Sequence, residues 1–202
     1  MSDPHAPAVL AAWKELRHGM RLDGLTFARR AFDAILDGVP MTIEETAAAV
    51  GATEQQAADF VDFFQRAGLM NLDGQTIVGS LGLTTQKTEY DVCINGRDLH
   101  VWCALDAVGI PAALHADAQV RVASFVDLDI HHGKLREAKP SSLRISLASP
   151  FIAQDMRQEI CPSIAFHEEA GPEHPDMAWL TLEEAMELGT IIWERPKSEK
   201  TV

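Results

Sequence analysis

A change of periodicity at Cys103 constrains this 202-residue chain more than any other sequence feature. The residues before Cys103 alternate in polarity like a strand, and those from Cys103 to about Leu114 favour a helix. We therefore expect Cys103 in the first helical turn, where unpaired N–H groups and the positive end of the helix dipole favour a thiolate. Asp106 follows three residues later and shares that helix face. A thiol and a carboxyl group are thus predicted to point into one site.

A purely structural role is the alternative for these two residues. A buried cysteine commonly serves as a small apolar core residue, and an acidic side chain is common at the start of a helix. The spacing alone is compatible with both interpretations.

The composition limits the partners of the chain. It has 47% hydrophobic and 23% charged residues, which is typical of a globular protein. Its formal net charge of −13 predicts no nucleic-acid and no membrane partner, because phosphate groups repel it. No apolar run approaches the ~20 residues of a membrane span. The first residues lack a signal-peptide pattern, and three cysteines suit a reducing compartment, so we expect a cytoplasmic protein.

Helical signals dominate the first part of the chain. Residues 1–22 are predicted to form an arm with a short helix, Val9–Leu16, that packs on the body. Residues 23–79 follow the order of a winged helix-turn-helix. The signals are an apolar helical stripe from Leu25, capping boxes that begin at Thr42 and Thr53, and a hairpin turn at Asp73-Gly74.

We interpret this winged-helix-like module as structural rather than DNA-binding. Its expected recognition helix, Thr53–Ala67, carries three acidic side chains and a single basic one, Arg66. An acidic helix is repelled by the phosphates that line a DNA groove. The module is therefore expected to act as a lid or a packing platform.

Residues 80–202 are predicted to form the catalytic α+β domain, a mixed or antiparallel sheet with short helices. The turn Asn95-Gly96 predicts a hairpin whose second strand leads into Cys103. Further strands are expected at Gln119–Val126, Leu143–Leu147, Ile160–Phe166 and Ile191–Trp193. The remaining expectations are a polar segment at Asp127–Pro140 that turns at Gly133, a short helix or turn at Phe151–Gln158, and a helix from the capping box at Thr181 to Leu188.

Cys161 is the natural partner of Cys103 from the far side of this domain. Two thiols that are distant in sequence, together with the carboxyl group of Asp106, suit a soft metal ion better than a hard one. Cys93 lies between two apolar residues of a predicted strand, and we interpret it as a buried core thiol.

The histidines and glycines predict no competing site. No histidine stands at a zinc-ligand spacing from a cysteine pair, so His131, His132, His167 and His174 are interpreted as surface residues. His100 is near Cys103 in sequence, but its position on a strand leaves its orientation undetermined. The glycine-containing stretch Gly79–Gly82 lacks the lysine of a phosphate-binding loop.

The run Trp102-Cys103-Ala104-Leu105-Asp106 closely resembles the active-site stretch of the organomercurial lyases, also called alkylmercury lyases. The run Arg157-Gln158-Glu159-Ile160-Cys161 resembles the segment that carries their second cysteine, and the resemblance spans most of the chain. In one departure, Ser124-Phe125-Val126 holds no cysteine where some members have a further one. The resemblance implies a structural role for that cysteine, so its absence bears on core packing more than on catalysis.

By this resemblance, Cys103 and Cys161 match the two mercury-binding cysteines and Asp106 matches the proton-handling acid. The family cleaves the carbon–mercury bond and releases a hydrocarbon and Hg(II), which these three residues would hold as product. It uses no organic cofactor, requires external small thiols, and passes Hg(II) to mercuric reductase. Proton transfer by Asp106 requires a raised pKa, which a water-poor pocket near Trp102 would favour.

Two other functions stay open at this point. A non-catalytic homologue with the same ligands would bind Hg(II) or copper without turnover. A metal- or thiol-responsive winged-helix regulator would use the reactive cysteines as a sensor, although its acidic recognition helix argues against DNA binding. A DNA mobility-shift assay at low salt separates the regulator from the lyase.

Overall fold

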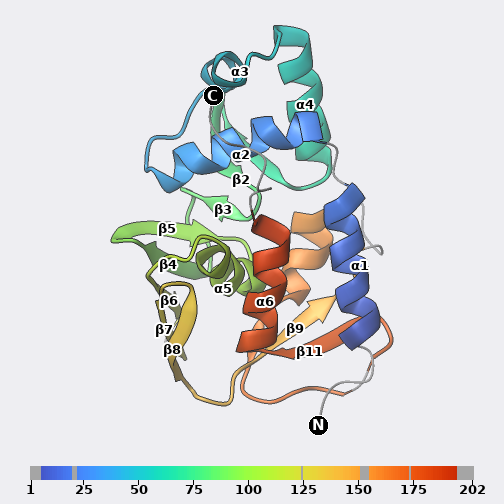
Figure 1. The fold of residues 1–202 in the computed structure, drawn as a ribbon, viewed down its shortest axis with the longest axis vertical. Helices are drawn as coiled ribbons and strands as arrows, with labels where there is room; N and C mark the ends of the chain where they lie inside the picture. The colour runs from blue at the N-terminus through green and yellow to red at the C-terminus, as the bar shows by residue number, and fades with distance from the viewer. Residues whose placement is uncertain (1–5, 20–21, 124, 151–154, 173, 195–202) are drawn as a thin grey trace.

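The computed structural model describes residues 6–19, 22–123, 125–150, 155–172 and 174–194 (Figure 1). Within them the chain is α+β, as the sequence predicts, with two antiparallel sheets and helices packed around them. None of the helices in these residues combines the length and the apolar character that a membrane span requires.

The N-terminal part contains four helices and a hairpin, which lie together in the upper half of Figure 1 except for the first helix. The elements are α1 (Ala6–Gly19), α2 (Leu22–Leu36), α3 (Ile43–Val50), α4 (Glu54–Arg66), β1 (Met70–Asp73) and β2 (Thr76–Ser80). Both predicted capping boxes are present, because the Thr42 and Thr53 side chains accept hydrogen bonds from the N–H groups three residues later. The fully buried Phe27 and Ile77 centre a separate apolar core between α2 and the hairpin.

The large sheet has eight strands in the order β1-β2-β3-β5-β4-β6-β7-β8. Its later strands are β3 (Leu83–Thr84), β4 (Tyr90–Ile94), β5 (Arg97–Val101), β6 (Ala118–Val122), β7 (Val126–His131) and β8 (Lys134–Lys139). The predicted Asn-Gly hairpin is confirmed, with Asn95 and Gly96 both at positive φ between β4 and β5. The strand β3 joins β2 to β5, so the N-terminal hairpin and the strand that precedes Cys103 belong to one sheet.

The hairpin of β7 and β8 corrects the expected polar segment at Asp127–Pro140. The predicted strand from Gln119 ends at Val122, and the chain turns before β7 begins. Residues Val126, Leu128 and Ile130 of β7 are buried, whereas β8 is an edge strand with mostly exposed side chains. Because β8 consists mainly of polar residues, the sequence there does not show the alternation of polar and apolar residues that predicts a strand.

The smaller sheet has the order β10-β9-β11, formed by β9 (Arg144–Ala148), β10 (Phe166–His167) and β11 (Met177–Thr181). The capping box at Thr181 starts α6, as predicted, but α6 (Leu182–Trp193) continues to Trp193. The expected strand at Ile191–Trp193 is therefore wrong. Its β-branched residues suggested a strand, and the packing of α6 on the buried helix α5 (Ala104–Ala113) decides otherwise.

Two glycines allow α5 and α6 to cross closely. A Cβ added at Gly189 would lie 2.1 Å from the Cα of Gly109. This contact fixes α6 against the helix that begins at Cys103, and Figure 1 shows the two helices side by side. The end of α6 thereby reaches the same side of the molecule as the start of α5.

Candidate active site

Cys103 is the N-cap residue of α5 and does not lie within its first turn. Its backbone is extended, with φ −150° and ψ 174°, and the helix begins at Ala104. The backbone N–H of Cys103 donates to Oδ2 of Asp106 at 3.1 Å, which is half of a capping box. The carboxyl group of Asp106 is thus held beside the residue that caps its own helix.

Cys161 lies at a junction of two short helical turns, and not in the predicted strand Ile160–Phe166. A single turn of π-helix, Met156–Ile160, ends at Cys161, which begins a 3₁₀ turn with Pro162 near its start. The Asp155 side chain accepts hydrogen bonds from the following N–H groups and starts the π-helical turn. Half of the predicted helix or turn at Phe151–Gln158, residues 151–154, lies outside the described residues.

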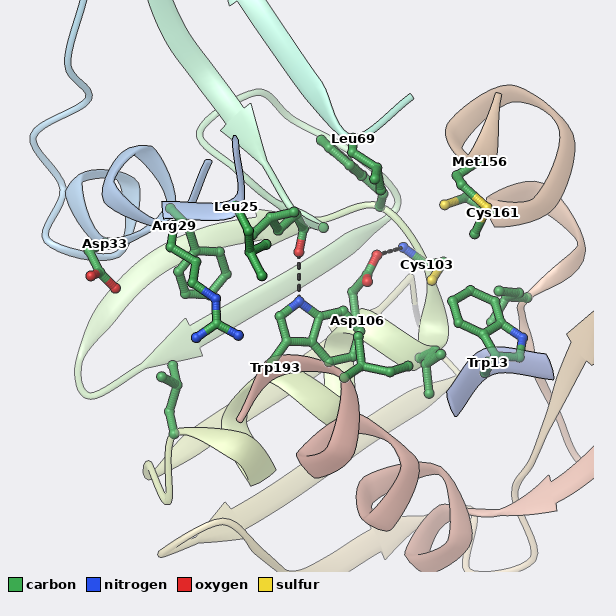
Figure 2. A pocket seen from close by; sticks show the side chains of 18 residues that line it. Trp13, Leu25, Arg29, Asp33, Leu69, Cys103, Asp106, Met156, Cys161 and Trp193 are labelled. Carbon is green, nitrogen blue, oxygen red and sulfur yellow. Dashed lines mark hydrogen bonds between the residues drawn. The ribbon is translucent and has the colours of Figure 1, made fainter. Parts of the chain in front are cut away.

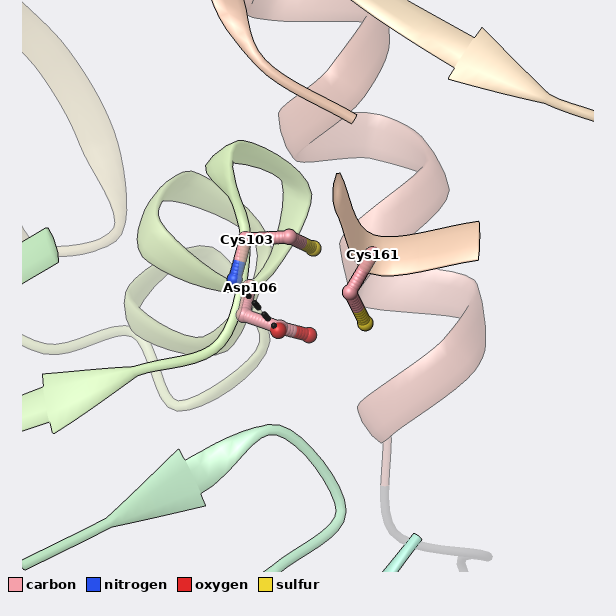
Figure 3. Close-up of side chains that lie close together, drawn as sticks. All are labelled: Cys103, Asp106 and Cys161. Atoms are coloured by element: carbon pink, nitrogen blue, oxygen red, sulfur yellow. Dashed lines mark hydrogen bonds between the residues drawn. The ribbon is translucent and has the colours of Figure 1, made fainter. Parts of the chain in front are cut away.

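The three predicted site residues converge. One sulfur from each cysteine and one carboxylate oxygen of Asp106 all lie within 4.8 Å of one another. Figure 3 shows Cys161 reaching across from the turn that faces the start of α5. Cys103 and Asp106 are 2% and 6% exposed, and Cys161 is half-buried. The two thiols and the carboxyl group are therefore arranged so that one ion can contact all three.

Burial controls the protonation of this cluster. Burial raises the pKa of Asp106 to about 7, although hydrogen bonds with Cys103 oppose the change. Burial also raises the pKa of Cys103 well above its usual value, and the Cys161 and Asp106 side chains add to this effect. Desolvation therefore opposes the thiolate that the position of Cys103 at a helix N-terminus favours. Burial thus favours the protonated form of Cys103 beside a carboxyl group whose pKa is raised to about 7.

An apolar cavity of about 80 Å³ adjoins the cluster (Figure 2). Its walls come from four helices, the Cys103 and Cys161 segments, and the loop after β2. They include Trp13 of α1, Leu25, Arg29 and Phe32 of α2, Leu69, Trp102, Met156, and Ile192 and Trp193 of α6. Trp102 lines the cavity as expected, and its ring lies under the guanidinium of Arg157 at 5.7 Å. A pocket with largely apolar walls therefore lies beside Asp106.

The N-terminal helix closes part of this cavity. Trp13 is buried, and its indole N–H donates to the carbonyl of Ala148 on β9 at 2.9 Å. The predicted arm thus packs on the body, and it contributes a wall to the cavity. In the sequence only the apolar face of α1 predicts that this helix packs on the protein. That face does not identify the surface against which the helix packs.

Gly82 is the neighbour of Asp106 that sequence reasoning missed. A Cβ at Gly82 would lie 2.4 Å from Oδ1 of Asp106, and its φ of +95° suits glycine. The carbonyl of Gly82 accepts from the Trp102 N–H at 3.1 Å, and the indole N–H of Trp193 donates to the carbonyl of Leu81 at 2.8 Å. The loop between β2 and β3 therefore packs against the carboxyl group of Asp106. The sequence gives no direct signal for this contact, because Gly82 lies 24 residues before Asp106 and the two meet only through the sheet.

The remaining candidates lie outside the cluster. Cys93 is half-buried on β4, less enclosed than the predicted core thiol. His100 lies 3.0 Å from a carboxylate oxygen of Asp91 through its Nδ1. His131, His132 and His174 are exposed, as expected, whereas His167 is half-buried with Nε2 3.0 Å from the hydroxyl of Ser146.

A buried thiol, a half-buried thiol and a carboxyl group meet at an apolar cavity, which is a donor set that suits a soft metal ion. Residues 83–194, more than half of the chain, match the family model MerB, alkylmercury lyase. The chain therefore belongs to the alkylmercury lyase family, whose members are carbon–mercury lyases. All three cluster residues lie in the matched segment.

Individual relatives agree with this family at low identity. The chain is 25% identical to the alkylmercury lyase of Staphylococcus epidermidis over 172 residues, which covers 80% of this chain and 78% of the relative. It is 28% identical to that of Pseudomonas putida over 168 residues, or 77% of each. A crystal structure of the mercury-bound form of MerB2 matches with a TM-score of 0.78 and 22% identity, covering 91% of this chain and 96% of the other. This last likeness supports the fold.

Proposed function

We propose that this protein is an organomercurial lyase that cleaves a carbon–mercury bond by protonolysis, with Cys103, Cys161 and Asp106 as its catalytic residues. The observation that carries the proposal is their convergence within 4.8 Å at a buried apolar cavity. Mercury is a soft ion that binds thiolates tightly, and the apolar walls suit the organic group attached to it.

The first step is transfer of the organomercury group to Cys103. The substrate arrives as R–Hg–SR′, bound to a small external thiol. Cys103 forms a sulfur–mercury bond and loses its proton, which leaves with the displaced thiol as R′SH. Because its raised pKa keeps the Cys103 proton on sulfur, the incoming thiolate is a suitable acceptor for that proton.

The second step is attack by Cys161 with proton transfer to Asp106. Cys161 gives its proton to the Asp106 carboxylate and bonds to the same mercury. Two thiolates on one mercury push electron density toward the bound carbon and weaken its bond. A carboxyl group with a pKa of about 7 is suited to accept a proton and to release it again near neutral pH.

The third step is protonation of the carbon by Asp106. The carbon–mercury bond breaks, the hydrocarbon R–H leaves, and the carboxylate is restored. Hg(II) stays on Cys103 and Cys161 beside Asp106. Two external thiols then remove it, and mercuric reductase is the proposed acceptor. No organic cofactor takes part in these steps.

The N-terminal elements are proposed to form a platform for the site. We assign residues 1–22 as the arm, 23–79 as the winged-helix-like module and 80–202 as the catalytic domain. The module packs its helix α2 onto the cavity through Leu25, Arg29 and Phe32. Its helix α4 exposes acidic side chains, so we propose that it binds no DNA. A reducing cytoplasm would keep the three free cysteines reduced.

A turnover assay tests the proposed function. Purified protein is incubated with an organomercurial and excess small thiol, and hydrocarbon and inorganic Hg(II) are measured over time. We expect repeated turnover that yields both products in equal amounts. Tight mercury uptake without hydrocarbon would contradict the lyase and identify a soft-metal-binding homologue.

A further inference from the structure

A second cluster of ligand side chains lies at the turn between β7 and β8. His131 is the last residue of β7, His132 follows in the turn, and Asp117 directly precedes β6. One ligand atom from each lies within 4.8 Å of the other two. None of these residues lines the cavity at Cys103.

Backbone hydrogen bonds from three loops hold this cluster in place. The N–H of His132 donates to Oδ1 of Asp117 at 2.8 Å. The N–H of Asp117 donates to Oδ1 of Asn95 at 3.2 Å, and the N–H of Asn95 donates to the carbonyl of Asp117 at 2.8 Å. The N–H of Gly133 donates to the carbonyl of Ala116 at 2.9 Å. The positions of the two histidines relative to Asp117 are therefore set by the fold.

The side chains are directed at a common point. Nδ1 of His131 lies 2.9 Å and Nδ1 of His132 lies 3.7 Å from Oδ1 of Asp117. The two imidazole rings lie with their centroids 4.0 Å apart. All three side chains are more than half exposed, so they can adjust to an ion and leave positions for water ligands. Two imidazoles and a carboxylate form a donor set that suits Zn²⁺ and similar transition-metal ions.

The local charges favour a cation. Asp117 is an exposed aspartate, and its carboxylate supplies a negative charge beside the two imidazoles. The cluster adjoins the carboxyl end of α5, because a Cβ at Gly133 would lie 2.8 Å from the carbonyl oxygen of Ala112. Helix carbonyls at this end carry partial negative charge.

We propose that Asp117, His131 and His132 bind a divalent transition-metal ion such as Zn²⁺, with water completing its coordination. This site is separate from the thiol cluster and independent of the lyase reaction. The ion would fasten the β7–β8 turn to the loop between α5 and β6. A ligand that binds only the folded state stabilises it, so Zn²⁺ should raise the melting temperature.

Titration calorimetry with ZnCl₂ tests this site on the full chain. The proteins are the wild type, the double variant His131→Gln/His132→Gln, and His174→Gln as a matched control with a different exposed histidine removed. We expect the double variant to bind one Zn²⁺ fewer than the other two and to lose the rise in melting temperature. Equal stoichiometry in all three proteins would overturn the proposal.

Titration with Co²⁺ separates this site from the cysteines. Cobalt bound by imidazole and carboxylate lacks the sulfur-to-cobalt charge-transfer bands of thiolate sites. In a Cys103→Ser/Cys161→Ser background we expect a Co²⁺ spectrum without these bands, and Asp117→Asn should weaken binding by about tenfold or more. Binding lost with the two cysteines and unchanged in Asp117→Asn would refute the site. Turnover of an organomercurial should be the same in wild type and His131→Gln/His132→Gln. Loss of the Zn²⁺ site is thereby distinguished from loss of the lyase activity.

Discussion

The cluster at Cys103 and the cluster at His131 each contain three ligand residues but have opposite surroundings. Each brings three ligand atoms within 4.8 Å, but the first is largely buried and the second exposed. Burial raises the pKa of Asp106 to about 7, whereas a backbone hydrogen bond lowers that of the exposed Asp117. Desolvation thus suits Asp106 to the proton-carrying role proposed for it, whereas the pKa of Asp117 is shifted in the opposite direction. We therefore assign bond cleavage to the first cluster and simple ion binding to the second.

The largest expected effect is loss of turnover in Cys103→Ser and in Cys161→Ser. Each change removes one of the two thiolates that act on the same mercury, so turnover should fall by at least about 1,000-fold. Hydrocarbon release from an organomercurial in excess thiol measures it. A Cys161→Ser enzyme with near-wild-type turnover would remove Cys161 from the mechanism.

A pH effect on stability distinguishes the two aspartates. Between about pH 4 and 7 folded Asp106 holds a proton that the unfolded chain has released, so the free energy of unfolding falls as pH rises through this window. Across this window the free energy of unfolding should fall by an amount on the order of 4 kcal/mol. Asp106→Asn should abolish this slope in denaturant unfolding measured at several pH values.

Asp117 serves as the control because its pKa is shifted the other way. Its stabilising contribution is present above the unfolded pKa and is lost as pH falls through the lowered folded value. Asp117→Asn should therefore leave the slope between pH 4 and 7 intact. If both variants or neither changed that slope, the contrast between the two sites would fail.

Asp106→Asn should also lower turnover by about 100-fold or more, because the amide can neither accept nor deliver the proton. In the wild type, kcat/KM should rise with pH through about 7 as the Asp106 carboxylate forms. Steady-state rates between pH 5.5 and about 9 measure both effects. A variant that keeps the wild-type rate and pH profile would exclude Asp106 as the proton carrier.

Gly82→Ala should lower turnover by about tenfold through displacement of the Asp106 carboxyl group. The added Cβ would lie 2.4 Å from Oδ1 of that group. Gly74→Ala is the matched control, because Gly74 also has a positive φ but nothing within 4 Å of an added Cβ. Both variants carry backbone strain of about 1 kcal/mol or more. Equal turnover in the two would show that contact with Asp106 is unimportant.

The smallest expected effect is that of Cys93→Ser. Cys93 is half-buried on β4 and lies outside both the thiol cluster and its cavity. Turnover should stay within about twofold of wild type, and mercury stoichiometry should be unchanged. A large loss would show that a third thiol takes part in mercury transfer.

Local sequence signals predicted much of the fold. The capping boxes at Thr42, Thr53 and Thr181 and the Asn95-Gly96 turn lie where expected, because each depends on residues a few positions apart. The pairing of Cys103 with Cys161 came from the soft-metal chemistry of two thiols and a carboxyl group and from a family resemblance.

Tertiary contacts account for what the sequence did not reveal. The length of α6 depends on its packing against α5, and the position of Gly82 beneath Asp106 depends on strands far apart in the chain. The raised pKa of Cys103 follows from burial by residues distant in the chain, which opposes the local effect of the helix N-terminus. The grouping of Asp117 with His131 and His132 likewise arises only when three loops meet.

X-ray absorption spectroscopy of the product complex tests most directly whether Cys103, Cys161 and Asp106 act as one site. Wild-type protein is allowed to turn over an organomercurial once, excess thiol is removed, and mercury content and its sulfur ligands are measured. We predict one Hg(II) per chain with two sulfur ligands in the wild type, and in Cys161→Ser loaded with the same organomercurial an uncleaved organomercury group on a single protein sulfur. Mercury with two sulfur ligands in Cys161→Ser, or bound outside these residues in the wild type, would contradict the account.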